Sequence, residues 1–210
     1  MIPGSSAGED PPVGGLRLVV GLGNPGPDYQ GSRHNVGFEI FDLLAGKLGG
    51  NSFGLRAGGR RLGEILRVPD RKCVLLRPLT FMNRSGTAVA AAADQLEVEP
   101  ASILVVSDDF HLPLGSLRLR SGGTCGGHNG LRSIEESLGT SAFPRLRVGV
   151  GEPRGNAVDH VLTSFRSAER SLLEETLQEA TLAAETWAVH GVSFEELQAR
   201  TNRRPPQADP

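Results

Sequence analysis

Cysteine is scarce in this sequence, and no hydrophobic run is long enough to cross a bilayer. The 210 residues include 2 cysteines, Cys73 and Cys125, which is too few for a disulfide framework, and neither belongs to a C-x-x-C pair. No uninterrupted apolar stretch approaches the ~18–20 residues that a transmembrane helix needs. The sequence therefore favours neither thiol chemistry nor a membrane segment.

Targeting signals are also missing from the first 15 residues. These residues have no basic start and no apolar core, and they carry Glu9 and Asp10, which argues against a secretory signal and a mitochondrial presequence. We therefore expect a cytoplasmic protein. Since both ends of the chain are polar and rich in proline, we predict a disordered lead-in at 1–15 and a disordered tail at 203–210, around one domain at 16–202.

The net charge of −2 is unevenly distributed along the chain. Residues 167–210 carry twice as many acidic as basic side chains, whereas arginines gather between residues 116 and 154. These arginines are Arg118, Arg120, Arg132, Arg145, Arg147 and Arg154. A basic stretch of this kind can neutralise a few phosphates, although charge alone is also typical of a solvated, salt-bridged surface.

Short runs rich in valine, isoleucine and leucine predict strands that are buried on both faces. They lie at Leu16–Leu22, Lys72–Arg77, Ile103–Ser107 and Arg145–Val150. Segments 52–57 and 60–68 predict a hairpin across Gly58 and Gly59. Because helical periodicity separates the other strands, the pattern predicts a single α/β domain with a twisted, mixed and mostly parallel central sheet flanked by helices.

The expected helices follow from apolar spacing and from capping signals. They cover Val36–Leu48, Ser85–Leu96, Gly130–Leu138, about 168–190, and a short segment after Ser193. Gly139 closes the third helix, and Ser167 is a possible cap for the long fourth helix. Ser193 and Glu196 have the spacing of a capping box.

Polar residues follow several of the predicted strands, which is where open α/β sheets bind their ligands. They stand directly after a strand, in the loop that leaves the first strand, or in a glycine-rich segment at 122–130 that opens a helix. They are Asn24, His34, Asn83, Asp108, Asp109, His128 and Asn129. We expect these side chains to gather on one rim of the sheet.

The first loop, GLGNPG at 21–26, matches the dinucleotide-binding pattern G-x-G-x-x-G. That site needs a helix to open directly at the glycines, whereas Pro25, Pro27 and Gly31 delay any helix by about ten residues. The sequence also contains no P-loop and no G-x-S-x-G motif. We therefore expect neither a nucleotide cofactor nor a serine hydrolase of that type.

Metal binding has only weak support in the sequence. Asp108, Asp109 and His111 lie close together, and Cys125 and His128 have a ligand-like spacing. No H-E-x-x-H motif or paired C-x-x-C motif accompanies them, and short groupings of this kind arise by chance in loops. We predict no metal and no cofactor.

His34, Asp108 and the carboxamides of Asn24, Asn83 and Asn129 form a set without an obvious serine or cysteine nucleophile. Such a set suits water as the nucleophile. A neutral imidazole can take a proton from water, and a carboxylate can fix its tautomer and stabilise the imidazolium. Amide groups can hold a peptide backbone and stabilise a developing oxyanion.

Each of these residues also has a structural explanation, which the sequence leaves open. The alternatives are a turn residue for Asn24, helix caps for His34 and Asn129, loop acids for Asp108 and Asp109, loop packing for Tyr29, and a structural or substrate-facing role for His128.

Five segments resemble the bacterial-type peptidyl-tRNA hydrolase family, in the family's order and over roughly 16–202. They are VVGLGNPGPDYQGSRHNVGFEIFDLLA (19–45), RPLTFMNRSG (77–86), ILVVSDDFHLPLG (103–115), GGTCGGHNGLRSI (122–134) and FPRLRVGVGEP (143–153). The resemblance implies a monomeric, metal-independent enzyme that cleaves the ester between a peptide and the 3′-terminal ribose of tRNA. Its partner is then peptidyl-tRNA, and the alternative is an RNA-binding relative without catalysis.

The resemblance also implies a role for each matching residue. His34 is the general base and Asp108 orients it, while Asn24, Asn83 and Asn129 hold the peptide main chain and position the scissile carbonyl. Asn129 is also a candidate for stabilising the intermediate. The remaining implied assignments are Met82, Gly127 and His128 to the peptide cleft, Tyr29 to the ester beside the terminal nucleotide, and Arg118, Arg120 and Arg147 to tRNA phosphates. The chain departs from many relatives at Ser107, directly before Asp108, and at His111, three positions after it.

Overall fold

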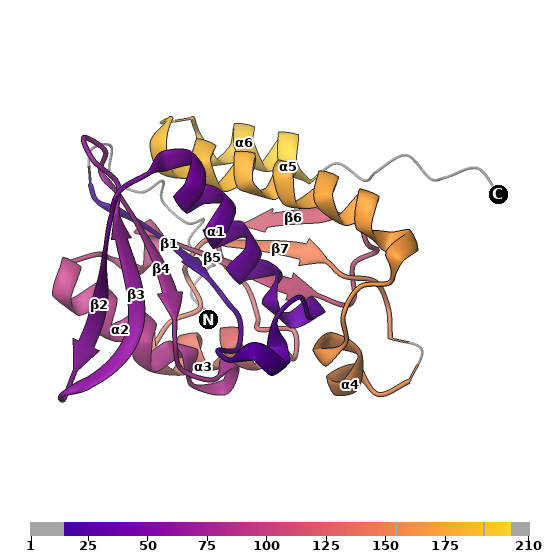
Figure 1. Cartoon of the computed structure of the whole chain (residues 1–210). Coiled ribbons are helices and arrows are strands. Elements are labelled where there is room, and N and C mark those ends of the chain that lie inside the picture. Colours follow the sequence, from indigo (N-terminus) through magenta and orange to yellow (C-terminus); the bar gives the residue numbers. More distant parts are fainter. Residues whose placement is uncertain (1–14, 154, 191, 203–210) are drawn as a thin grey trace, which may run out of the picture.

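The structure, a computed structural model, describes residues 15–153, 155–190 and 192–202. In this part of the chain seven strands form one twisted sheet in the order β2-β3-β4-β1-β5-β7-β6, with helices on both faces (Figure 1). The predicted α/β class and the mixed, mostly parallel sheet are therefore confirmed. The predicted disordered ends, apart from residue 15 itself, lie outside the described residues.

The centre of the sheet is parallel. It consists of β1 (Arg17–Gly21), β4 (Cys73–Pro78), β5 (Ile103–Asp109) and β7 (Arg145–Gly149). Strand β1 pairs in parallel with β4 and β5, and β5 pairs in parallel with β7. Their carboxyl ends therefore meet at one rim, as expected from the apolar runs.

The two edges of the sheet are antiparallel. The predicted hairpin is formed by β2 (Asn51–Ala57) and β3 (Arg60–Arg67), and its turn places Gly58 and Gly59 at φ 54° and 76°. At the other edge, β6 (Leu117–Arg120) pairs with β7. The sequence analysis missed β6 because its LRLR pattern of alternating burial extends over only 4 residues.

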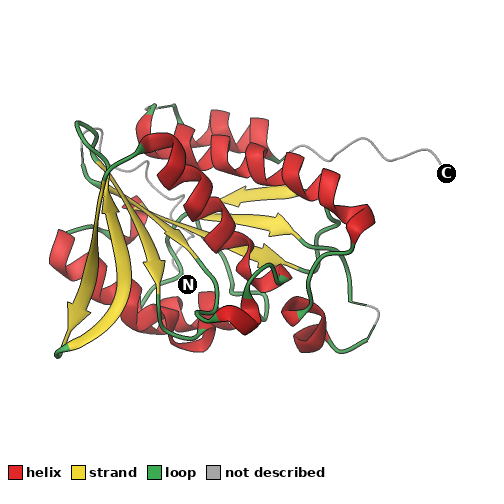
Figure 2. Cartoon of the chain, in the orientation of Figure 1, coloured by secondary structure: helices red, strands yellow, loops and turns green. Residues whose placement is uncertain are grey.

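Two layers of helices cover the sheet, as the colours of Figure 2 show. One layer contains α1 (Val36–Leu48), α5 (Arg170–Val189) and α6 (Phe194–Thr201), and the other contains α2 (Ser85–Leu96) and α3 (Asn129–Leu138). Successive strand residues serve opposite layers: Val19 packs with α1 and α5, whereas Leu18 and Val20 pack with α2 and α3. None of the helices in the described ranges is both long and apolar enough to span a bilayer.

The helix boundaries correct two details of the sequence analysis. Ser167 is not the cap of the long helix, because it lies in a preceding 3-10 turn (Ser167–Glu169) in which the Arg166 backbone N–H donates to the Glu169 carboxylate at 2.7 Å. Ser193 does cap α6, through a 3.2 Å hydrogen bond from the Glu196 N–H. A further short helix, α4 (Ala157–Leu162), was not predicted.

The first turn of α1 lies directly on the sheet because it contains glycine. A Cβ atom at Gly37 would lie 2.4 Å from Leu22 N and 2.7 Å from Val106 O. This close approach to the ends of β1 and β5 brings the residues just before α1 over the carboxyl rim of the sheet.

Candidate active site

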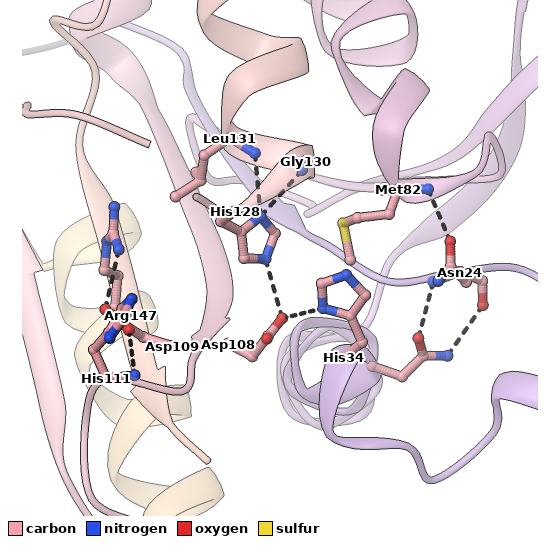
Figure 3. A network of polar contacts seen from close by, with 11 residues as sticks. Asn24, His34, Met82, Asp108, Asp109, His111, His128, Gly130, Leu131 and Arg147 are labelled. Atoms are coloured by element: carbon pink, nitrogen blue, oxygen red, sulfur yellow. Dashed lines mark hydrogen bonds and ion pairs between the residues drawn. The ribbon is translucent and has the colours of Figure 1, made fainter. Parts of the chain in front are cut away.

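Three titratable side chains meet at that rim, each from a different element (Figure 3). His34 lies in a 3-10 turn (Arg33–Asn35) before α1, Asp108 lies near the end of β5, and His128 directly precedes α3. They line a cleft of about 560 Å³. Asp108 thus contacts His34, which lies 74 positions before it in the sequence, and His128, which lies 20 positions after it.

His34 and Asp108 form a hydrogen-bonded pair. The His34 Nδ1 atom lies 2.6 Å from Asp108 Oδ1, and the two residues are 9% and 1% exposed. With an ionised carboxylate, Nδ1 must carry the proton and donate it. The Nε2 atom has no hydrogen-bond partner among the described residues and is free to accept a proton in the cleft.

The Asp108 carboxyl group is held in its ionised form. Burial alone would raise its pKa, but electrostatic interactions and hydrogen bonds with His128 and His34 outweigh burial and lower the pKa below its usual range. Asp108 therefore carries a full negative charge at neutral pH and can stabilise an imidazolium at position 34.

Asn24 is oriented by hydrogen bonds on three of its atoms. Its backbone N–H donates to Asn35 Oδ1 at 2.9 Å, and its carbonyl oxygen accepts from Asn35 Nδ2 at 3.0 Å. Its side-chain Oδ1 accepts the Met82 N–H at 2.8 Å. Since Oδ1 is occupied, the Asn24 NH₂ group remains available to a ligand in the cleft. Asn24 is therefore more than a turn residue.

The other two asparagines are exposed in the cleft. Asn83 lies in a 3-10 turn (Met82–Arg84). Asn129 Oδ1 accepts a 3.4 Å hydrogen bond from Arg132, which leaves the Asn129 NH₂ group as a donor. His34 and Asn129 are not helix caps, because the N-cap of α1 is Asn35 and the N-cap of α3 is His128.

Apolar side chains form the walls of the cleft. Tyr29 packs edge-on against Phe81, with ring centroids 6.4 Å apart, and Met82 and Gly127 also line the cleft. Val158 and Leu162 of α4 also line the cleft. The sequence analysis missed these two residues because α4 spans only 6 residues, too few for a clear helical period.

The predicted phosphate ligands fall into two groups. Arg118 and Arg120 are exposed on edge strand β6. Arg147 is buried, and its guanidinium donates to Asp109 Oδ2 at 3.0 Å and to the Thr124 carbonyl at 2.7 Å. These bonds hold Arg147 inside the protein, where it anchors the glycine-rich loop. We therefore propose only Arg118 and Arg120 as phosphate ligands.

The residues that could hold a metal differ from those grouped in the sequence analysis. One potential ligand atom from each of His34, Asp108 and His128 lies within 4.8 Å of the others. Asp109 is instead bound to Arg147 and to the His111 backbone N–H. His34 Nδ1 and His128 Nε2 both lie within hydrogen-bond distance of one Asp108 oxygen, so the contacts suit a hydrogen-bond network.

The cysteines stand apart from this chemistry. Burial raises the pKa of Cys73 to about 12, which leaves it a poor nucleophile. Cys125 lies in the glycine-rich loop and is partly buried.

An α/β sheet whose carboxyl rim carries a histidine, a carboxylate partner and free amide donors around a cleft is typical of hydrolytic enzymes. The model of the peptidyl-tRNA hydrolase family matches residues 18–208. The chain belongs to this family.

Individual relatives agree over most of the chain. A peptidyl-tRNA hydrolase from Synechococcus sp. (strain JA-3-3Ab) is 47% identical over 192 residues, which cover 84% of this chain and 79% of the relative. One from Syntrophomonas wolfei is 41% identical over 180 residues, with 84% and 96% covered. The crystal structure of the Acinetobacter baumannii peptidyl-tRNA hydrolase superposes with a TM-score of 0.80 at 34% identity and covers 91% of this chain and 96% of that one.

Proposed function

We propose that this protein hydrolyses the ester bond between a peptide and the 3′-terminal ribose of tRNA, which returns free tRNA from prematurely released peptidyl-tRNA. The observation that carries the proposal is the His34–Asp108 pair, with its 2.6 Å hydrogen bond and its free Nε2 atom in the cleft. Membership of the peptidyl-tRNA hydrolase family supplies the substrate class.

In the proposed reaction, His34 Nε2 takes a proton from water and the resulting hydroxide attacks the ester carbonyl carbon. Asp108 stabilises the imidazolium that forms. The carbonyl oxygen becomes negatively charged, and the free NH₂ groups of Asn129 and Asn24 are suited to donate to it. Collapse of the intermediate breaks the bond to the ribose 3′ oxygen, which receives the proton from His34.

Substrate binding follows from the remaining cleft residues. Asn24 and Asn83 offer polar groups to the peptide main chain, and Met82, Gly127 and His128 line its path. Tyr29 stands at the ester, beside the terminal nucleotide. Arg118 and Arg120 contact tRNA phosphates from β6, since both are exposed on the same face of that strand.

We further propose that the protein acts as a cytoplasmic monomer. The His34–Asp108 pair (the dyad), the amide donors and the cleft walls all come from one chain, so no second copy is needed to complete the site. Size-exclusion chromatography with light scattering measures the oligomeric state directly.

The replacement His34→Ala tests the proposed base. We expect peptide release from purified peptidyl-tRNA to fall by about 10²–10⁴-fold, the usual contribution of a positioned base, with little change in tRNA affinity. His111→Ala is the matched control, because His111 is an exposed histidine at the same rim that lies against the Phe110 ring. Equal turnover of His34→Ala and wild type would exclude His34 as the base.

The wild-type assay also separates the two functional hypotheses. A chain that binds tRNA but never releases peptide would be the RNA-binding relative without catalysis.

A further inference from the structure

His128, the second histidine beside Asp108, has a fixed ring orientation that plays no part in the steps of the proposed reaction. We propose that His128 is a positioning residue: the start of α3 fixes its ring tautomer so that it donates to Asp108 and holds the carboxylate in place for His34. This inference rests on the proposed hydrolytic function, because its role is defined through the His34–Asp108 pair.

The backbone of α3 determines which ring nitrogen of His128 carries the proton. The N–H groups of Gly130 and Leu131 donate to His128 Nδ1 at 3.1 and 3.2 Å. A nitrogen that accepts two hydrogen bonds carries no proton, so the proton of the neutral ring must be on Nε2. A proton on Nδ1 would face two N–H groups and the positive end of the helix dipole.

The protonated nitrogen points at the catalytic carboxylate. His128 Nε2 lies 3.0 Å from Asp108 Oδ1, the same oxygen that receives the 2.6 Å bond from His34 (Figure 3). The centroids of the two imidazole rings lie 5.1 Å apart, and each ring reaches this oxygen from a different direction. Asp108 is therefore held from two directions, and a rotation that would favour one histidine breaks the bond to the other.

Packing prevents the His128 ring from turning away. The residue is 8% exposed, and a Cβ atom at Gly130 would lie 2.5 Å from Met82 Sδ and 3.0 Å from His128 Cε1. Glycines at 126 and 127, with φ of 58° and 82°, turn the loop into α3. Arg147 anchors that loop through the Thr124 carbonyl.

Sharing Asp108 between two donors has a chemical consequence. The second donor withdraws negative charge from the oxygen that faces His34, and so weakens the attraction of Asp108 for a protonated His34 ring. The other charged groups nearby, Asp109 and Arg147, are bound to each other. His128 thereby limits how strongly Asp108 binds the His34 ring while holding the carboxylate in place.

Two replacements separate the two bonds of the His128 ring. In His128→Asn, the amide oxygen occupies the position of Nδ1 and can still cap α3, but the side chain is too short to reach Asp108. In His128→Gln, the amide N–H group occupies the position of Nε2 and can still donate to Asp108. The assay is steady-state peptide release from peptidyl-tRNA at several pH values, together with the thermal melting temperature.

For His128→Asn we expect an unchanged melting temperature, a kcat lower by about 10–100-fold and a KM within about twofold of wild type. The acidic limb of its kcat/KM profile should move to higher pH, because Asp108 then favours the protonated form of His34. His128→Gln should recover most of the lost kcat. Nitrogen chemical shifts of the wild-type ring should report a protonated Nε2 and an unprotonated Nδ1.

Other outcomes overturn the inference in distinguishable ways. A raised KM with normal kcat in both variants would make His128 a peptide ligand only, and wild-type kinetics in His128→Asn would make it a helix cap only. A ring protonated at Nδ1 in the wild type would contradict the tautomer directly. Failure of the proposed function has a different signature, since the wild-type protein itself would then release no peptide.

Discussion

Arg33, the residue before His34, is buried with both ends of its guanidinium group engaged. It donates to the Val150 carbonyl at 2.8 Å and to Glu169 Oε2 at 2.7 Å, and it lies 4.5 Å from the centre of the Phe165 ring. Glu169 in turn holds the Arg166 backbone. This one side chain therefore connects the turn that carries His34 to the segment that precedes α5.

Replacement of Glu169 should change stability in a pH-dependent way. Burial opposes ionisation of this carboxyl, but bonds from Arg166 and Arg33 outweigh it and lower its pKa to about 2. Stability from a lowered carboxyl pKa is present above the ordinary value and is lost as pH falls toward the folded value. We expect Glu169→Gln to be about 1–3 kcal/mol less stable at pH 7, with the difference closing between about pH 4 and pH 2.

Urea denaturation at pH 7, 4 and 3 measures this trend. Glu174→Gln, which removes an exposed carboxylate of the same helical region, is the control and should match wild type throughout. A Glu169→Gln deficit that stays constant down to pH 3 would contradict the ionic explanation.

At the scale of elements, helices α2 and α3 touch at a glycine. A Cβ atom at Gly86 would lie 1.9 Å from the Ser133 carbonyl oxygen and 2.4 Å from Ser137 Oγ. The Gly86 N–H also donates to Ser133 Oγ at 3.0 Å. Because α3 begins with Asn129 directly after His128, this contact sets the position of the loop and helix start that face the dyad.

Gly86→Ala should therefore separate the two helices. Overpacking of this kind costs about 1–3 kcal/mol, and we expect reduced peptide release as well, since the start of α3 must move. Gly46→Ala is the matched control, because a Cβ atom there, in the last turn of α1, meets nothing within 4 Å. It should stabilise the protein by about 0.5–1 kcal/mol. A fully active and equally stable Gly86→Ala protein would show that α3 has more freedom than the structure indicates.

At the scale of the whole molecule, basic side chains lie at opposite ends of the fold. Arg118 and Arg120 are on edge strand β6, while Arg67 and Arg71 flank the β3–β4 connection at the rim remote from the dyad. Phosphate neutralisation releases counterions, so each functional contact contributes to the salt dependence of tRNA binding.

The double replacement Arg118→Ala and Arg120→Ala should flatten that dependence. We expect the slope of log K against log salt to fall by about 1 for each lost contact, with weaker binding at low salt. The same change at Arg67 and Arg71 should leave the slope unaltered. The slopes are measured by fluorescence anisotropy with labelled tRNA over a range of salt concentrations. Equal slopes for the two double variants would show that Arg118 and Arg120 do not contact tRNA phosphates.

The elements that could be predicted from the sequence are those long enough to show a repeated hydrophobic pattern. The parallel strands and the bounds of α1 and α2 follow from continuous apolar runs and from helical spacing, which are properties of neighbouring residues. Strand β6 and helix α4, with 4 and 6 residues, are too short to show a period. The apolar wall that α4 adds to the cleft was missed for the same reason.

The sequence by itself determined the candidate residues of the site: a histidine, a carboxylate and three asparagines that follow the predicted strands or stand in the loops and helix starts beyond them, in segments that resemble one family. Only the tertiary structure decided which atoms meet. Arg147 turns inward to Asp109, and His128 shares an Asp108 oxygen with His34. Such pairings depend on strand order, on the close packing of α1 against the sheet and on that of α3 against α2. Residues far apart in the chain carry no local signal of a contact that forms only when the sheet assembles.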